Sequence, residues 1–434
     1  MTGGSWAVAA LLCWHLGASG GLPKEVPVEQ IRPWALNQRH VRVLVLDGAK
    51  SVSLRPSSPA VLVDPASGAR LASVGGGATI TARWWNGQVV VRTGRRRISL
   101  SAVRIEPASG AITVSAQGGG RRGVYPGALE IAADAAAVRV INDLDLESYL
   151  AGVVAAEVPR TFPLEAMKAQ AIAARTYALF HLGDHEAQCA DLCGEVHCQA
   201  FHGVPPPDSP ASRAAQETAG EVLVYNGVLL DAQYSAACSG HTVAAWQTRQ
   251  GKLLPYLGGA DDRAADGAYC AQGHHATWTR RFTSAEAQRL IARNLKTVLG
   301  DHSIRPGKLL ALRVAERNGN RVRWFEVKTT TATYRVMGDA VRWLFGNGCP
   351  GPSGLRSTRF DLKVRTDRRG RPRAFVFIGA GHGHGIGMCQ WGARGRALAG
   401  HTAEEILGAY YPGAEVWNLR RGEEAKGERR RERG

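Results

Sequence analysis

Residues 144–180, LDLESYLAGVVAAEVPRTFPLEAMKAQAIAARTYALF, contain two helical patterns separated by a proline-marked break. The apolar residues of the first pattern recur at helical spacing and predict a helix with one buried face: Leu146, Tyr149, Leu150, Val153 and Val154. Pro159 disfavours a helical conformation at the residue before it, so the first helix ends there. Thr161 and Pro163 mark the start of the second helix. The stretch therefore predicts a helix, a short break and a second helix.

Glu157 closes the first helix in an otherwise apolar setting, VVAAEVP. A carboxyl group among apolar groups has a raised pKa, as a general acid acting on a glycosidic oxygen requires. Lys168 and Arg175 lie seven residues apart and share one face of the second helix. Ala171 and Ala174 on this helix leave room for an anionic or sugar ligand, although a solvated basic face is the alternative. Cations near Glu157 would lower its pKa, and the sequence leaves open whether they outweigh burial.

The remaining chain predicts an α+β protein. Residues 22–135 contain short alternating apolar runs separated by turn residues, and predict a β-rich N-terminal region. Helical periodicity is expected over residues 136–180. Residues 277–348 form a separable α+β unit with a helix, a strand–turn–strand and a second helix. Residues 418–434 are charged and almost free of apolar side chains, which predicts a disordered tail.

Composition and charge restrict the class of protein. The 434 residues suffice for two or three domains, and a hydrophobic fraction of 44% is ordinary for a globular chain. The net charge of +17 favours an anionic partner, but no zinc-finger or RNA-binding signature supports nucleic acid. Residues 1–21 have an apolar stretch followed by small residues, which predicts a secretory signal although no Lys or Arg precedes it. No second run of about 18 apolar residues predicts a membrane span.

Five histidines and cysteines, residue types that bind metal ions, lie in a short loop with the pattern His185-x3-Cys189-x3-Cys193-x3-His197-Cys198. Thiolates and imidazoles at such spacing are reasonable ligands for a structural zinc ion. A chain exported to an oxidising compartment offers a disulfide as the competing interpretation. Zinc, a disulfide and free thiols therefore all remain open from the sequence.

Three blocks of the chain resemble the stage II sporulation protein D / amidase-enhancer family. The first is the helical stretch quoted above, and the second is YSAACSGHT at 234–242. The third is GHGHGIGMCQWGARG at 381–395, followed by YYPGAEV at 410–416. The resemblance covers residues 140–245 and 350–416. It implies a catalytic core built from segments 136–276 and 349–417, with the 277–348 unit inserted between them.

The resemblance also implies an activity. The family members are lytic transglycosylases of peptidoglycan that prefer glycan strands stripped of stem peptides. The family's catalytic acid matches Glu157, and its helper Lys and Arg match Lys168 and Arg175. One carboxylic acid suffices, because the muramic C6 hydroxyl attacks C1 and leaves a 1,6-anhydro end; no cofactor is required for catalysis. Stripping exposes the lactyl carboxylate, with which the two cations could pair.

Further residues are assigned from the matching blocks. His384 lies in GHGHGIGM and is expected in a substrate cleft beside Gln390, with a helix-capping turn as the alternative. Ser239 and His241 are weaker candidates for the same cleft. A hydrolase built on Ser239 lacks the Gly-x-Ser-x-Gly elbow of such enzymes.

Metal and cysteine assignments follow the resemblance too. Some relatives carry a structural metal on positions matching Cys193, His197 and Cys198, with His185 or Cys189 as the fourth ligand. Separately, a bridge between Cys238 and Cys270 is expected. A metallohydrolase using His382 and His384 is disfavoured, because alternate residues of a strand point to opposite sides.

The family's second name implies a different role, a peptidoglycan-binding activator of a separate cell-wall amidase without catalysis of its own. The intact set of Glu157, Lys168 and Arg175 favours the enzyme. The expected partner is the glycan strand of peptidoglycan, and the expected location is the periplasm or cell envelope. The sequence leaves open whether the process is sporulation or general wall remodelling.

Overall fold

The structure, a computed structural model, describes most of the chain in several ranges: 25–37, 40–116, 122–247, 253–265, 267–273, 277–346, 354–421 and 423–424. The expected secretory signal at 1–21 lies outside the described residues. No described helix is long and apolar enough to cross a membrane. The fold class is α+β, as predicted from the sequence.

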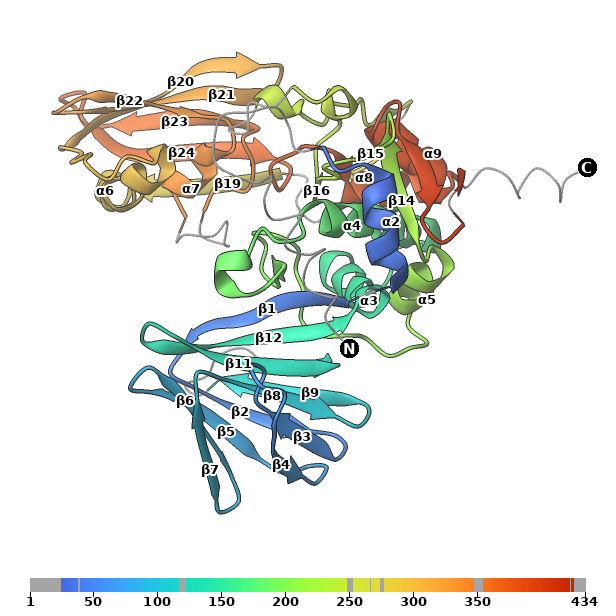
Figure 1. Cartoon of the computed structure of the whole chain (residues 1–434). Coiled ribbons are helices and arrows are strands. Elements are labelled where there is room, and N and C mark those ends of the chain that lie inside the picture. The colour runs from blue at the N-terminus through green and yellow to red at the C-terminus, as the bar shows by residue number, and fades with distance from the viewer. Residues whose placement is uncertain are drawn as a thin grey trace, which may run out of the picture.

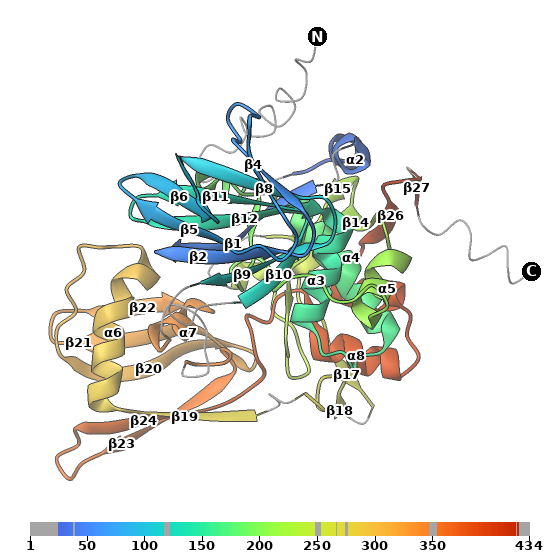
Figure 2. The ribbon, with the colours of Figure 1, turned by 90° about the horizontal axis from the view of Figure 1, so that it is seen from below.

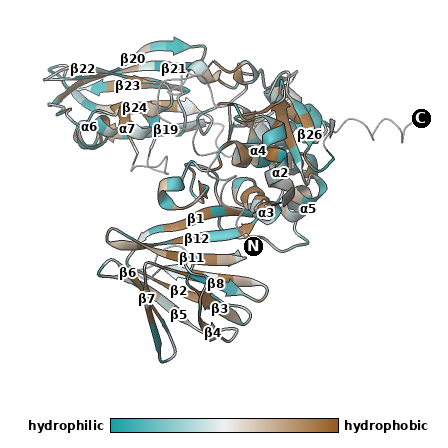
Figure 3. Cartoon of the chain, viewed as in Figure 1, coloured by the Kyte–Doolittle hydropathy of each residue, from teal (hydrophilic) through white to brown (hydrophobic). Residues whose placement is uncertain are grey.

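The N-terminal region is a sandwich of two β-sheets (Figure 1). The first sheet has the order β13 (Leu192–Cys193), β1 (His40–Ala49), β12 (Ala137–Asp145), β11 (Ala128–Asp134), β8 (Ala102–Pro107), β3 (Ala60–Val63), β4 (Arg70–Val74). The second has the order β10 (Arg122–Pro126), β9 (Ala111–Ala116), β2 (Ser51–Pro56), β5 (Ile80–Trp85), β6 (Gln88–Thr93), β7 (Arg96–Leu100). Alternating apolar side chains from both sheets fill one core, and hydrophobic residues recur along β1 (Figure 3).

The helical pattern expected from residue 136 begins later in the structure. Residues 137–145 form β12, which pairs antiparallel with β1 and β11. The Asp145 side chain then accepts a hydrogen bond from the Ser148 amide at 3.0 Å and caps α3 (Leu146–Glu157). A central strand of the sandwich therefore leads directly into the first helix of the quoted stretch.

The second unit contains the predicted helix pair. α3 and α4 (Leu164–Phe180) pack with α5 (Pro210–Glu217), and residues from the C-terminal block complete the unit as α8 (Gln390–Leu398) and α9 (Ala403–Tyr410). A four-stranded sheet has the order β15 (Val228–Leu229), β14 (Glu221–Tyr225), β26 (Glu415–Asn418), β27 (Glu423–Glu424). β16 (Tyr234–Ser235) pairs in parallel with β25 (Met388–Cys389). The two matching blocks therefore share one core.

Short elements complete this unit. The β14–β15 hairpin turns at Asn226 and Gly227, whose φ values of 50° and 78° fit a two-residue hairpin turn. The N-terminal helix α2 (Val28–Asn37) starts against this turn, where the Val28 amide donates to the Gly227 carbonyl at 3.0 Å. The remaining short elements are η1 (Glu186–Gln188), η2 (Ala245–Gln247), η3 (Pro255–Leu257), β17 (Arg263–Ala264) and β18 (Gly267–Ala268).

The inserted unit has its own core and stands apart from the sandwich in Figure 2. One sheet has the order β19 (Thr277–Thr283), β24 (Pro372–Ala380), β23 (Phe360–Thr366), and the other β20 (Leu309–Asn318), β21 (Arg321–Thr329), β22 (Thr333–Met337). α6 (Ser284–Leu299) and α7 (Ala340–Leu344) pack with them. Because β23 and β24 pair with β19, residues 360–380 join this unit rather than the core segment 349–417 to which the sequence analysis assigned them.

The charged tail also differs from its expected boundary. Asn418 is the last residue of β26, Leu419 is buried, and β27 pairs with Trp417 and Asn418. The prediction of disorder from residue 418 is therefore wrong for this first part, because an apolar side chain at 419 packs into the core. Residues 425–434 lie outside the described part of the chain.

Candidate active site

Glu157 is the last residue of α3, as the sequence predicts. Val158 adopts an extended conformation, with φ −127° and ψ 144°, before Pro159. The Glu157 carboxyl group is held by two donors from distant parts of the chain. The Ala200 amide donates to Oε1 at 2.8 Å, and the Gln390 Nε2 amide donates to Oε2 at 3.0 Å. These bonds orient the carboxyl group while the side chain keeps part of its surface open.

Burial determines the protonation of this group. Desolvation raises the pKa of Glu157 above its ordinary value, and the hydrogen bonds from Ala200 and Gln390 lower the pKa by less. Neither Lys168 nor Arg175 contributes to the shift. The sequence left open whether burial or nearby cations would control the pKa of Glu157. In the structure burial has the larger effect, which favours the protonated carboxylic acid.

A set of neutral polar side chains lies around the acid. The Gln199 side chain donates to the Tyr234 hydroxyl at 2.9 Å and accepts from the Tyr149 hydroxyl at 3.1 Å. Burial raises the pKa of both tyrosines well above its ordinary value, and a charge on Glu157 raises it further, so their hydroxyl groups stay neutral. The surroundings thus contain hydrogen-bonding groups without a second carboxylate among the described partners of Glu157.

Sequence reasoning missed most of these neighbours. Gln170 accepts from the Gln390 amide at 3.4 Å, and it belongs with Gln199 and the Ala200 amide to the neighbours that the sequence did not mark. Tyr234 does open the matching block YSAACSGHT, which is the only signal that could have marked it. A backbone amide such as that of Ala200 carries no residue-type signal at all.

An open groove lies beside the end of α3. Its volume is about 470 Å³. Its walls are mainly small and aliphatic: Gly123, Val124, Gly152, Ala155, Ala156, His202, Gly203, Val204 and Pro205. Ala155 and Ala156 precede Glu157, and the segment from His202 follows Ala200. The groove therefore flanks the two chain segments that place the acid.

Arg175 occupies a different environment from the one expected. Its side chain is 0% exposed and forms a two-pronged ion pair with Glu147, with Nη2–Oε2 2.5 Å and Nε–Oε1 3.2 Å. It also donates to the carbonyls of Ala215 and Glu221 at 3.2 and 3.0 Å. Because these contacts satisfy the buried guanidinium, the structure does not bring Arg175 to Glu157 or to a ligand surface.

Lys168 lies nearer the surface, with 21% of its side chain exposed. It pairs with Glu165 at 3.0 Å and with Glu217 at 2.6 Å. Ala171 and Ala174 are fully buried in the protein core. The helix face on which a ligand was expected, with Ala171 and Ala174, is therefore packed in the hydrophobic core and is closed to a ligand.

The other predicted substrate residues separate into two places. Gln390 lies at Glu157, whereas Ser239, His241 and His384 line a cavity of about 450 Å³ that does not include Glu157. The cavity lies between the core and the inserted unit, because Arg321, Arg323 and Arg359 line it as well.

His384 is neutral and bonded at both ring nitrogens. The Ile386 amide donates to Nδ1 at 3.1 Å, so Nε2 carries the proton and donates to the Tyr234 carbonyl at 2.8 Å. Burial lowers the pKa of His384 to about 4. His384 thereby holds the segment that carries Tyr234. The following helix, α8, is capped by Cys389 and not by His384.

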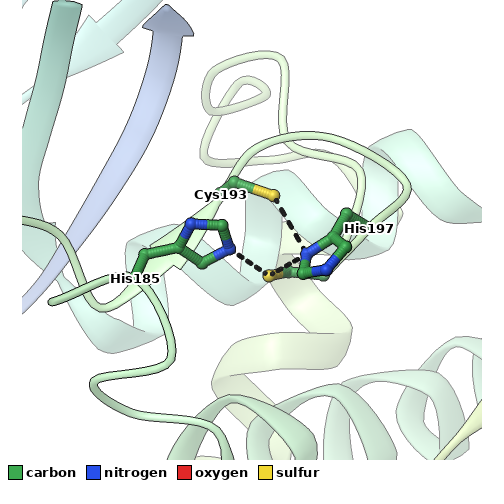
Figure 4. Close-up of side chains that lie close together, drawn as sticks. His185, Cys193 and His197 are labelled. Atoms are coloured by element: carbon green, nitrogen blue, oxygen red, sulfur yellow. Dashed lines mark hydrogen bonds between the residues drawn. The ribbon is translucent and has the colours of Figure 1, made fainter. Parts of the chain in front are cut away.

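The Cys/His loop brings four ligand-type side chains together. Figure 4 shows His185, Cys193 and His197 converging. The Cys198 sulfur lies 3.2 Å from His185 Nε2 and 3.4 Å from His197 Nδ1, and the Cys193 sulfur lies 3.9 Å from His197 Nδ1. Nitrogen and sulfur ligands of tetrahedral zinc lie about 3.6 Å apart, from bonds of about 2.0 and 2.3 Å. This donor set therefore fits zinc.

Cys189 lies outside this cluster. Cys189 is exposed and its φ is 59°. Its backbone amide donates to the Glu186 carbonyl at 2.8 Å, and its carbonyl accepts from the Arg42 side chain at 3.0 Å. His185 and Cys189 were the two candidates for the fourth metal ligand. The structure places His185, and not Cys189, beside Cys193, His197 and Cys198. Cys189, Cys193 and Cys198 form no disulfide. The expected bridge between Cys238 and Cys270 is not formed either, because their sulfur atoms lie 3.8 Å apart.

Two protein-family models match this chain, and one of them covers Glu157 and the Cys/His loop. Residues 134–225 match the family model described as "Stage II sporulation protein", and residues 265–387 match a domain of unknown function. The second match spans most of the inserted unit, including β24. The resemblance to the stage II sporulation protein D family is thus confirmed, and the family domain contains Glu157 and the Cys/His loop.

Similar proteins from two bacteria match most of the same chain. Stage II sporulation protein D of Bacillus subtilis is 25% identical over 291 residues, which cover 64% of this chain and 75% of that protein. The amidase enhancer of the same organism is 27% identical over 298 residues, covering 61% of this chain and 39% of that protein. An uncharacterized protein of Brachyspira hyodysenteriae is 27% identical over 284 residues, covering 65% and 69%. The two Bacillus subtilis proteins and the matching family model support a role connected with sporulation or the cell wall.

Proposed function

We propose that this protein is a peptidoglycan lytic transglycosylase in which Glu157 is the catalytic acid and base. The observation that carries the proposal is the Glu157 carboxyl group, whose pKa burial raises and whose two oxygens accept from Ala200 and Gln390. A carboxyl group with a raised pKa, fixed at the end of a helix, suits protonation of a glycosidic oxygen. Ala155 and Ala156, which precede it, line the open groove.

The reaction needs no second carboxylate. Glu157 donates its proton to the oxygen between MurNAc and GlcNAc as the bond from C1 breaks. The resulting carboxylate takes the proton from the muramic C6 hydroxyl, whose oxygen bonds to C1. The products are a 1,6-anhydromuramyl end and a free GlcNAc hydroxyl, and no water is consumed. Glycan strands stripped of stem peptides are the proposed substrate.

The location and the metal belong to the same proposal. Peptidoglycan lies outside the cytoplasm, so the chain acts in the periplasm or cell envelope. His185, Cys193, His197 and Cys198 hold a structural zinc ion, which stabilises the loop that ends at Ala200. Because Ala200 donates to Glu157, the metal supports the acid through the backbone.

Product mass tests the proposal. The full chain is incubated with purified glycan strands lacking stem peptides, and the released fragments are analysed by mass spectrometry. Anhydro ends, one water lighter than the hydrolysis product, are expected. Reducing ends, or fragments formed equally by Glu157→Gln, would overturn the assignment.

The amidase enhancer relative supports a second candidate, a peptidoglycan-binding activator of a cell-wall amidase. This candidate predicts no glycan cleavage by the purified chain, but faster release of stem peptides by an added amidase. Such stimulation should survive Glu157→Gln, which separates the two functions.

A further inference from the structure

Three cysteines and an aspartate lie together in the core, away from the Cys/His loop. Cys238 follows β16, Asp262 and Cys270 lie on the segment around β17 and β18, and Cys389 ends β25. Each is at most 3% exposed. Their ligand atoms all lie within 4.8 Å of one another.

The spacing of these atoms is that of metal ligands. The sulfur atoms of Cys238 and Cys270 are 3.8 Å apart, and the Cys238 sulfur is 3.2 Å from Asp262 Oδ2. Thiolates on tetrahedral zinc lie about 3.8 Å apart, and a thiolate and a carboxylate oxygen about 3.5 Å apart. A disulfide requires sulfur atoms about 2.05 Å apart and would leave one of three cysteines over.

Neighbouring groups hold the ligands as in a metal site. Asp262 Oδ1 accepts from the Tyr410 hydroxyl at 2.6 Å and from Arg396 Nε at 3.2 Å, which orients Oδ2 toward the sulfur atoms. The Cys389 sulfur accepts from the backbone amides of Cys238 and Gly392 at 3.2 and 3.3 Å. Such hydrogen bonds to ligands orient them toward a metal.

The charged side chains around the cluster fit a bound divalent cation. Three thiolates and one carboxylate around a divalent ion leave a net charge of about −2. Arg396 and Arg321 supply two positive charges. Arg321 is 7% exposed, donates to the Cys238 carbonyl at 3.0 Å, and has no carboxylate ion-pair partner in the described ranges. An anionic metal–thiolate centre explains why this arginine is buried here.

We propose that Cys238, Cys270, Cys389 and Asp262 bind a second structural zinc ion. Thiolate ligands select zinc over the harder divalent ions, and a closed four-ligand shell leaves no position for catalysis. Cys389 directly precedes Gln390, which donates to Glu157. The ion fastens the start of α8 to two other segments and thereby positions Gln390; this inference does not depend on the proposed reaction.

Zinc content of the full chain, purified under anaerobic conditions, tests the site. Cys270→Ser is expected to lose about one zinc ion per chain relative to wild type, because a serine hydroxyl is a poor zinc ligand at neutral pH. Cys189→Ser is the matched control, since this exposed cysteine lies outside both clusters. Equal zinc content in wild type and Cys270→Ser would overturn the proposal.

A second measurement on the wild-type chain covers the case in which Cys270→Ser does not fold. Alkylation followed by peptide mass spectrometry should find Cys238, Cys270 and Cys389 protected until a chelator is added under denaturing conditions. Cobalt replacing this zinc should give charge-transfer absorption from three thiolates. A disulfide-linked Cys238–Cys270 peptide, or rapid alkylation of all three thiols, would show that no metal is held.

Discussion

Gln390 Nε2 lies 3.0 Å from Glu157 Oε2, although 233 residues separate the two in the chain. The first residue of α8 thus reaches the last residue of α3, and the long inserted unit leaves this contact intact. The candidate acid is therefore complete only when both matching blocks of the chain are packed together.

Glu157→Gln should abolish most glycan cleavage while leaving binding unchanged. The amide keeps the shape of the side chain but cannot donate the required proton, so turnover should fall by ~10²–10⁴. Turnover on denuded glycan strands and co-sedimentation with the same strands measure the two effects. Glu165→Gln on α4, which leaves the acid untouched, is the control. Full activity in Glu157→Gln would reject the assigned role.

Gln390→Met should shift the pH profile of cleavage. The Gln390 amide stabilises the charged form of Glu157 and lowers its pKa. Its removal raises that pKa further, so the protonated acid persists to higher pH and the alkaline limb of the profile moves upward. A rate measured across pH for both proteins gives the shift. Gln216→Met, at an exposed position on α5, is the control, and the alkaline limb of its rate profile should stay at the wild-type pH. A shift of this limb to lower pH in Gln390→Met would contradict the argument.

The two helices could be predicted because their signals are local. The apolar residues from Leu146 to Val154 repeat with helical spacing. β12 could not be separated from the following helix, because short apolar runs fit both patterns until strand partners are known. Those partners, β1 and β11, lie elsewhere in the sequence.

The site was predictable only where a residue type has few alternatives. An acid in an apolar stretch marked Glu157, and clustered ligands marked His185 to Cys198. Arg175 looked like a ligand-binding cation because its partner Glu147 lies 28 residues away, on another helix. Spacing within one helix places side chains on a face but does not say what covers that face.

Arg175→Ala should destabilise the fold far more than Lys168→Ala. Removing Arg175 leaves Glu147 without its two-pronged partner and leaves buried carbonyls unsatisfied, which should cost about 3 kcal/mol or more of unfolding free energy. Lys168 is partly exposed, and its surface pairs contribute at most about 1 kcal/mol. Denaturant unfolding compares them. The free energy of unfolding of Arg175→Lys should lie between those of wild type and Arg175→Ala, because one ammonium group cannot form both hydrogen bonds of the guanidinium to Glu147. Equal stability of Arg175→Ala and Lys168→Ala would refute this interpretation.

Removal of zinc from the Cys/His loop should lower both thermal stability and turnover. Cys193→Ser removes a thiolate ligand, and the loop that ends at Ala200 then loses its fixed geometry. The Ala200 amide no longer orients the Glu157 carboxyl group, so turnover falls together with zinc content and Tm. Because the cysteine thiols must lose their protons to bind zinc, zinc retention should also decrease as the pH falls. Cys189→Ser alters the same loop without touching the cluster and should match wild type in all three measurements. If it behaved like Cys193→Ser, or if chelation left turnover unchanged, the coupling between metal and acid would be disproved.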